Sequence, residues 1–144
     1  MVTEKRKPLP KISEVTAPFW AGCKRHELLI QHCAGCGTYR FPPQPMCRKC
    51  NSMKYDWSKV DGKGKIFSYM TVPGFHPRAS PMGYWPLDGY PINVVIVELA
   101  GTGGVRIVSN LVGCSPGDMK IGLPVEVVFE DINEQVTLPK FKLA

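Results

Sequence analysis

The sequence predicts a mainly β protein with three consecutive parts: a short N-terminal helix, a rubredoxin-like zinc ribbon and a five-stranded OB-fold barrel. Two Cys-x-x-Cys pairs predict the ribbon. Several short runs rich in β-branched and aromatic residues predict the barrel, because no convincing helix separates them. We therefore expect a flexible arm over residues 1–12, the helix and ribbon over 13–57, and the barrel over 58–144.

The first element expected is a short helix that follows the basic, proline-rich arm. Thr16 is the predicted N-cap, and Phe19 and Cys23 lie one turn apart on an apolar stripe. Lys24 and Arg25 follow near the C-terminus, where positive charge is favourable to the helix dipole. Two interpretations of these cations stay open, a solvated surface or contact with a phosphate.

The ribbon is predicted from two short strands that each lead into a cysteine pair, at residues 27–31 and 39–41. A tetrahedral Zn²⁺ site takes four thiolates, and each Cys-x-x-Cys places two of them on one tight turn. We expect Gly35 and Gly37 to supply the positive φ of such a turn. A site of four cysteines is closed to water and substrate, so its predicted role is structural. A redox-active pair and disulfides are the alternatives. The predicted ligands are Cys33, Cys36, Cys47 and Cys50.

Five strands are expected in the barrel, each recognised by β-branched and aromatic residues. Gly-rich residues 101–104 and residues 130–134 are predicted hairpin turns, and residues 115–122 a further turn. The five predicted strands cover residues 65–72, 91–99, 105–112, 125–129 and 136–141.

A long connection, residues 73–90, interrupts this regular pattern of strands. It combines several prolines with aromatic residues, and a long connection without secondary structure in a compact domain is usually functional or disordered. Because the aromatic content argues against disorder, we interpret the segment as a ligand-binding or partner-docking loop. Its candidate contact residues are Phe75, His76, Arg78, Tyr84, Trp85 and Tyr90.

Charge is distributed unevenly along the chain, whose formal net charge is +6. Residues 1–70 hold 13 Lys and Arg against 5 Asp and Glu, whereas residues 71–144 hold 5 against 7. A basic half is typical of proteins that bind nucleic acid or a phosphate-bearing ligand, although a solvated surface is the simpler interpretation. We expect a cytoplasmic protein without a membrane span, because no apolar run approaches about 18 residues.

Two motifs complete the pattern: Val60-Asp61-Gly62-Lys63-Gly64-Lys65-Ile66-Phe67-Ser68-Tyr69 before the barrel, and the closing stretch Ile121-Gly122-Leu123-Pro124-Val125-Glu126-Val127-Val128-Phe129. With the helix and the two cysteine pairs, they resemble the zinc-ribbon/OB-fold proteins found beside thiolases, hydroxymethylglutaryl-CoA synthase-like enzymes and steroid side-chain aldolases. The resemblance covers about residues 10–141. Within this family the chain looks most similar to the small subunits of thiolases in anaerobic toluene degradation.

The resemblance implies a non-catalytic accessory subunit in a hetero-oligomer with a thiolase-fold enzyme that cleaves carbon–carbon bonds of acyl-CoA. It implies one structural zinc per chain and a coenzyme A ester at or near the interface. In that setting Lys24, Arg25 or Arg78 would contact phosphates, and the aromatic residues of the long loop would cover the acyl group or anchor the interface.

Two other functions remain as alternatives. One is a binder of single-stranded nucleic acid, with Lys63, Lys65, Phe67 and Tyr69 as a stacking surface. The other is a free-standing enzyme, for which no recognisable nucleophile–base pair is present.

Overall fold

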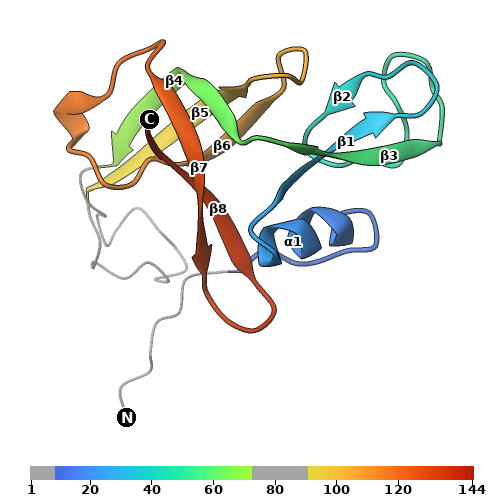
Figure 1. Cartoon of the computed structure of the whole chain (residues 1–144), viewed down its shortest axis with the longest axis horizontal. Coiled ribbons are helices and arrows are strands. Elements are labelled where there is room, and N and C mark those ends of the chain that lie inside the picture. Colours follow the sequence, from blue (N-terminus) through green and yellow to red (C-terminus); the bar gives the residue numbers. More distant parts are fainter. Residues whose placement is uncertain (1–8, 73–90) are drawn as a thin grey trace, which may run out of the picture.

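The computed structural model describes residues 9–72 and 91–144, and it contains one α-helix, a three-stranded sheet and a five-stranded barrel (Figure 1). The helix and the small sheet lie on one side of the molecule and the barrel on the other. The expected mainly β architecture is thereby confirmed. Within the described ranges, no helix has the length and apolar composition needed to cross a membrane.

Helix α1, Ala17–Lys24, begins where the sequence predicts. Its Phe19 and Cys23 are buried, as the apolar stripe indicated. Thr16 occupies the N-cap position, but its side chain does not bond to the helix. The Thr16 hydroxyl instead accepts the backbone N–H of Ser13 at 2.9 Å, which organises the chain just before the helix.

The small sheet has the order β2-β1-β3 and is antiparallel throughout. Strand β1, Leu28–Cys33, is central; β2, Tyr39–Arg40, and β3, Tyr55–Val60, flank it. The sequence pattern predicted the first two strands but not β3, which pairs with the whole of β1. The division suggested at residues 57 and 58 therefore falls inside a strand of this sheet.

The barrel sheet has the order β6-β5-β4-β7-β8. A parallel bridge between Leu111 and Phe141 joins its two outer strands, and the Val112 N–H donates to the Phe141 carbonyl at 2.8 Å. This parallel contact nearly closes the sheet, as the OB-fold prediction requires. The strands are β4 (Lys63–Val72), β5 (Ile92–Leu99), β6 (Arg106–Asn110), β7 (Pro124–Asp131) and β8 (Thr137–Leu143), with a 3₁₀ turn at Pro116–Asp118 between β6 and β7.

Two glycines explain the Val-x-Gly-x-Gly motif that leads into β4. Gly62 has φ +74°, and a Cβ there would overlap the Cγ1 of Val127. A Cβ on Gly64 would overlap the Glu98 carbonyl oxygen and lie 2.7 Å from the Val97 Cγ1. Each glycine therefore permits a close approach between β4 and a neighbouring strand.

One hydrophobic core joins the helix and small sheet to the barrel. Phe19 and Cys23 of α1 and Leu28 and Ile30 of β1 belong to the same buried cluster as the inward-facing barrel residues. The barrel members of the cluster are Ile66, Val95, Val97, Leu99, Ile107, Leu111, Met119, Val125 and Phe141. The two predicted domains consequently pack as one body.

Candidate metal centre

The four predicted ligands come together at the end of the small sheet remote from its covalent connection to the barrel. Cys33 ends β1, Cys36 follows on the turn toward β2, and the second pair lies between β2 and β3. All four Sγ atoms lie within 4.8 Å of one another. The Cys33 and Cys50 sulfurs are 3.5 Å apart, and those of Cys36 and Cys47 are 3.7 Å apart.

The two pairs form equivalent turns. The Gly37 N–H donates to the Cys33 carbonyl and the Asn51 N–H to the Cys47 carbonyl, both at 2.9 Å. Gly37 has φ +74° and Asn51 has φ +61°, so each turn ends in a left-handed residue. Gly35 lies outside the positive-φ region, which corrects the expectation that both glycines supply it. Asn51 was not singled out, although Asn is among the few residues that readily adopt this conformation.

Backbone N–H groups point at the sulfurs. Gly35 and Cys36 donate to the Cys33 Sγ at 3.3 and 3.5 Å, and Lys49 donates to the Cys47 Sγ at 3.4 Å. Such bonds favour the thiolate form, and the N–H of Cys36 is the main reason that the pKa of Cys33 is lowered. The backbone of both turns therefore stabilises the thiolate form of these cysteines.

The thiols differ in acidity. The Thr38 hydroxyl, 3.1 Å from the Cys36 Sγ, is the largest cause that lowers the pKa of Cys36 to about 6. For Cys50 the backbone N–H of Ser52 lowers the pKa, but the neighbouring sulfurs and burial outweigh it and raise the pKa to about 11. Four thiolates so close together repel one another, and a dication relieves that repulsion.

The spacing of the sulfurs fits a tetrahedral zinc ion. With Zn–S bonds of about 2.3 Å, tetrahedral geometry separates the sulfurs by roughly 3.8 Å, close to the 3.5 and 3.7 Å separations present. His32, next to Cys33, contacts another partner: its Nδ1 bonds to the Ser58 hydroxyl at 2.9 Å. Four thiolates fill all four positions, so the arrangement is suited to a structural metal and leaves no position for substrate.

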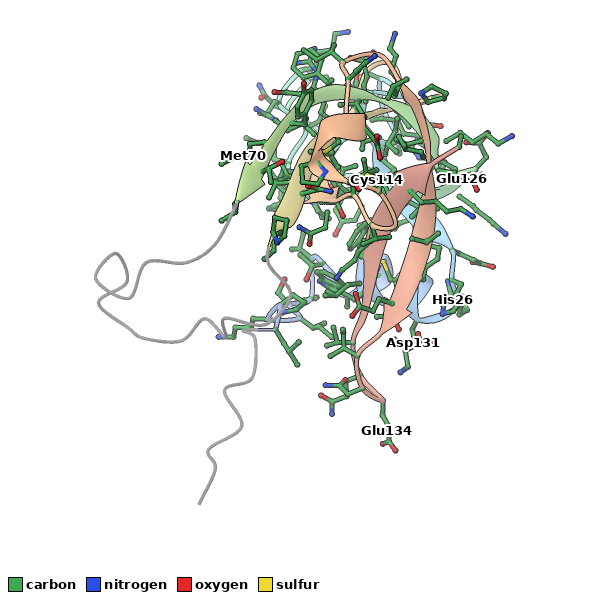
Figure 2. All side chains as sticks on the ribbon, turned by 90° about the vertical axis from the view of Figure 1, so that its left-hand side faces the viewer. His26, Met70, Cys114, Glu126, Asp131 and Glu134 are labelled. Atoms are coloured by element: carbon green, nitrogen blue, oxygen red, sulfur yellow. The ribbon has the colours of Figure 1, made fainter. Side chains whose placement is uncertain are left out.

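The basic residues at the C-terminal end of α1 and just beyond it contact the barrel. Lys24 Nζ donates to the Asn133 carbonyl at 2.8 Å, and His26 Nε2 lies 3.0 Å from Asp131 Oδ1. The His26 ring also stacks on Phe129 at 5.2 Å. Figure 2 shows His26 beside Asp131, with Glu134 at the tip of the β7–β8 hairpin. Of the three cations suggested for phosphate, Lys24 is therefore engaged with this hairpin.

Arg25, the other cation suggested here, is half-exposed and lies 3.5 Å from the Glu27 carboxylate. The proposed contact residues of the long loop, Phe75, His76, Arg78, Tyr84, Trp85 and Tyr90, fall outside the described residues. Their predicted roles stay predictions.

The two remaining cysteines are poor nucleophiles. Burial raises the pKa of Cys23 to about 12. Desolvation and the nearby Asp118 carboxylate raise the pKa of Cys114, whose carbonyl and sulfur accept from the Asn93 amide at 3.1 and 3.8 Å. Neither thiol therefore resembles an activated catalytic cysteine.

The surface considered for nucleic acid lies on β4. Phe67 occupies a bulge in the β4–β5 pairing, and the Arg106 guanidinium sits 3.6 Å from the centre of its ring. One face of Phe67 is thus already covered by a cation.

A buried polar network joins β1 and β2 to Gln44, and the sequence pattern did not predict it. The Gln31 Oε1 accepts from Arg40 Nε at 2.8 Å and from the Gln44 N–H at 2.9 Å. Arg40 Nη2 donates to the Gln44 carbonyl at 2.8 Å. Nothing in the local pattern signals this, because Gln31 and Arg40 stand in short strands among apolar residues.

Together the fold and this centre define a zinc-ribbon protein fused to an OB-fold barrel. Residues 20–54 match the sequence model described as the ChsH2 rubredoxin-like zinc ribbon domain, and residues 57–130 match the ChsH2 C-terminal OB-fold domain. The chain belongs to the ChsH2-like, or DUF35, family.

The chain is similar to curated proteins that are named either as hydratase alpha subunits or as scaffold proteins. The chain is 36% identical over 138 residues to a probable enoyl-CoA hydratase alpha subunit of Thermomonospora curvata; the match covers 96% of this chain but 40% of that relative, so the chain spans about two fifths of its length. It is 33% identical over 112 residues to a DUF35 domain-containing scaffold protein of Methanocaldococcus jannaschii, covering 77% of this chain and 73% of the other. A 3-oxo-4,17-pregnadiene-20-carboxyl-CoA hydratase alpha subunit of Mycobacterium tuberculosis is 34% identical over 85% of this chain and 36% of its own.

Solved structures share the whole architecture. A chain of an Ltp2-ChsH2(DUF35) aldolase superposes with a TM-score of 0.80 at 35% identity, covering 94% of this chain and 98% of that one. A DUF35-family protein of unknown function from Sulfolobus solfataricus superposes with a TM-score of 0.58 at 15% identity, over 92% and 87% of the two chains, which shows the fold alone.

Proposed function

We propose that this chain is a non-catalytic, zinc-binding accessory subunit of a hetero-oligomeric enzyme that cleaves carbon–carbon bonds of acyl-CoA esters. The observation that carries the proposal is the match to a chain of the Ltp2-ChsH2 aldolase, because it covers nearly all of both chains at 35% identity. The ribbon, the barrel and their junction are all retained in that relative, whose description names both a partner and an activity.

The chemistry of the described residues favours a non-catalytic role for this chain. Zinc, when bound by Cys33, Cys36, Cys47 and Cys50, supplies cross-linking of the two turns. The sulfurs themselves leave no place for a reacting group, and the pKa values of Cys23 and Cys114 are both raised. The nucleophile and base of the reaction would therefore come from the partner.

The partner class we favour is a thiolase-fold catalytic subunit. More narrowly, we propose that the complex is a benzoylsuccinyl-CoA thiolase of aromatic degradation with this chain as its small subunit, on the basis of overall sequence likeness. Two relatives named as alpha subunits of CoA-ester hydratases support the broader role in acyl-CoA metabolism. A relative named as a scaffold protein supports the accessory role. The coenzyme A ester would lie at or near the interface.

The test is purification of the full chain from its native lysate with identification of its partner and a zinc assay of the eluate. We expect one thiolase-fold partner in fixed stoichiometry and about one zinc per chain. The complex should cleave an acyl-CoA ester that the chain alone leaves intact. Turnover by the isolated chain, or co-elution with nucleic acid in place of a protein partner, would refute the proposal.

The substrate that the purified complex accepts distinguishes the benzoylsuccinyl-CoA thiolase assignment from the general accessory role. A purified complex that accepts benzoylsuccinyl-CoA supports the thiolase assignment. A complex that hydrates or cleaves only other CoA esters retains the accessory role and rejects that substrate.

A further inference from the structure

A cavity of about 380 Å³ lies where the ribbon meets the barrel. One wall comes from residues 38–41 and 47–49 of the ribbon, and the other from residues 103–106 at the β5–β6 hairpin. Figure 1 shows this hairpin loop on the side of the barrel that faces β2. The volume falls in the range of small-molecule sites.

The cavity is lined by four cations and by no acidic residue of the described part of the chain. Arg40, Arg48 and Lys49 come from the ribbon wall and Arg106 from the barrel wall. Since the positive groups stand on two opposite walls, an anion between them would be contacted from both sides.

The burial of Arg40 distinguishes the cavity from an ordinary basic surface. Its exposed fraction is 6%, and its Nε and Nη2 are held by Gln31 and by the Gln44 carbonyl. Nη1 is buried and has no acceptor, and among the described residues no carboxylate lies within ion-pair distance of the guanidinium. The Arg40 Cζ lies 5.3 Å from the centre of the Tyr55 ring, which compensates the charge only in part. A buried guanidinium without a counter-ion is costly, and an anion bound in the cavity would offset that cost through its charge rather than through a bond to the inaccessible Nη1.

The other cations are positioned to complete such a site. Arg48 and Lys49 are exposed, and their side chains have no ion-pair partner within the described ranges. Arg106 lies 3.4 Å from Glu98 and over the Phe67 ring, so its guanidinium is fixed in orientation and only partly neutralised.

We propose that this cavity binds a phosphate group, either free or as the monoester end of an organic ligand. A phosphate dianion matches several cations, and the arginine fork favours tetrahedral oxyanions that accept several hydrogen bonds at once. The half-buried rings of Tyr39 and Phe41 line the same cavity and would contact the organic part of a monoester. The inference goes beyond the accessory role and does not require it.

The test is calorimetric titration of the zinc-loaded full chain with inorganic phosphate, adenosine monophosphate and acetate. We expect phosphate to bind with a dissociation constant of about 1 mM or below, and acetate more weakly. Tighter binding of the nucleotide than of phosphate would identify a monoester ligand, and equal binding would identify free phosphate.

Variants assign the binding to the cavity. Arg48→Ala with Lys49→Ala should weaken phosphate binding about tenfold or more, because charge-assisted hydrogen bonds are lost. Arg106→Ala should do the same from the other wall, and it keeps the test valid if the ribbon variant loses its metal. The matched control is Lys65→Ala with Lys120→Ala, which removes two exposed charges outside the cavity lining and should change affinity less than about twofold.

Three results would overturn the proposal. One is the absence of phosphate binding at millimolar concentration. Another is equal weakening in the control and the cavity variants, which would indicate only general charge attraction. The third is acetate binding as tightly as phosphate, which would identify a carboxylate site.

Discussion

Replacement of Gly62 by Ala separates two costs that usually occur together, backbone strain and steric overlap. Gly62 and Gly101 both have φ +74°, so an alanine at either position is forced into the left-handed region. Their surroundings differ. A Cβ at Gly101 meets nothing within 4 Å, whereas a Cβ at Gly62 would overlap the Val127 Cγ1 and lie 3.0 Å from the Val127 Cβ.

The magnitudes follow from these surroundings. Gly101→Ala should cost about 1–2 kcal/mol of unfolding free energy, the price of a left-handed L-residue. Gly62→Ala adds an overpacking cost of about 1–3 kcal/mol, because Val127 is held by its N–H bond to the Gly62 carbonyl at 2.9 Å and is not free to move away. We therefore expect a total of about 2–5 kcal/mol for Gly62→Ala.

Urea denaturation of the zinc-loaded chain measures both variants, with the midpoint read at constant slope. In the double variant Gly62→Ala with Val127→Ala, the overlapping methyl is absent. Its loss of stability should then be smaller than the sum of the two single losses by about 1–3 kcal/mol. Equal losses for Gly62→Ala and Gly101→Ala, or strict additivity with Val127→Ala, would refute the claim that contact between β4 and β7 requires the glycine.

Three further predictions concern the metal, a surface carboxylate and the buried network. Cys33→Ser should abolish stoichiometric zinc, measured by elemental analysis, and yield a chain that is unfolded by circular dichroism or insoluble. The control Cys114→Ala should retain both zinc and the activity of the assembled complex. Normal zinc content in Cys33→Ser would contradict the structural role of the metal site. The Thr137 hydroxyl and then His26 lower the pKa of Asp131 below its ordinary 3.8, so Asp131 contributes stability that is present above that value and is lost as the pH falls through the lower folded-state pKa. The stability difference between wild type and Asp131→Asn should accordingly vanish in acid, and a difference that grows in acid would contradict the assignment. Gln31→Leu removes the acceptor shared by two buried donors and should cost about 2–4 kcal/mol in urea denaturation, with a cost near zero arguing against the network.

Local sequence patterns were sufficient for the barrel strands and for the set of sulfurs. The alternation in residues 65–72 and the continuous apolar run in 91–99 are set by which face of each strand is buried, so they predict β4 and β5 to within two residues at each end. The Cys-x-x-Cys spacing likewise follows from the geometry of a single turn, and the four sulfurs converge as the spacing predicts.

Contacts between distant segments were not accessible in this way. Nothing near His26 indicates that it meets Asp131, because the two are 105 positions apart and each also has an ordinary role as a surface residue. The pairing of β3 with β1 is a choice of partner, which periodicity does not encode. The cavity at Arg40 depends on both of its walls, and neither the three cations of the ribbon wall nor Arg106 of the barrel wall indicates the other wall.

The core shared by α1, β1 and the barrel makes the thermodynamics of the barrel depend on metal chemistry some distance away. Because Leu28 and Ile30 pack in the same cluster as Phe141, loosening of the ribbon exposes apolar surface of the barrel as well. A ligand that binds only the native chain adds stability in proportion to the logarithm of its free concentration. The melting temperature of the barrel should thus rise with free zinc, and a chelator should act on it as a denaturant although the barrel strands contain none of the four predicted ligands.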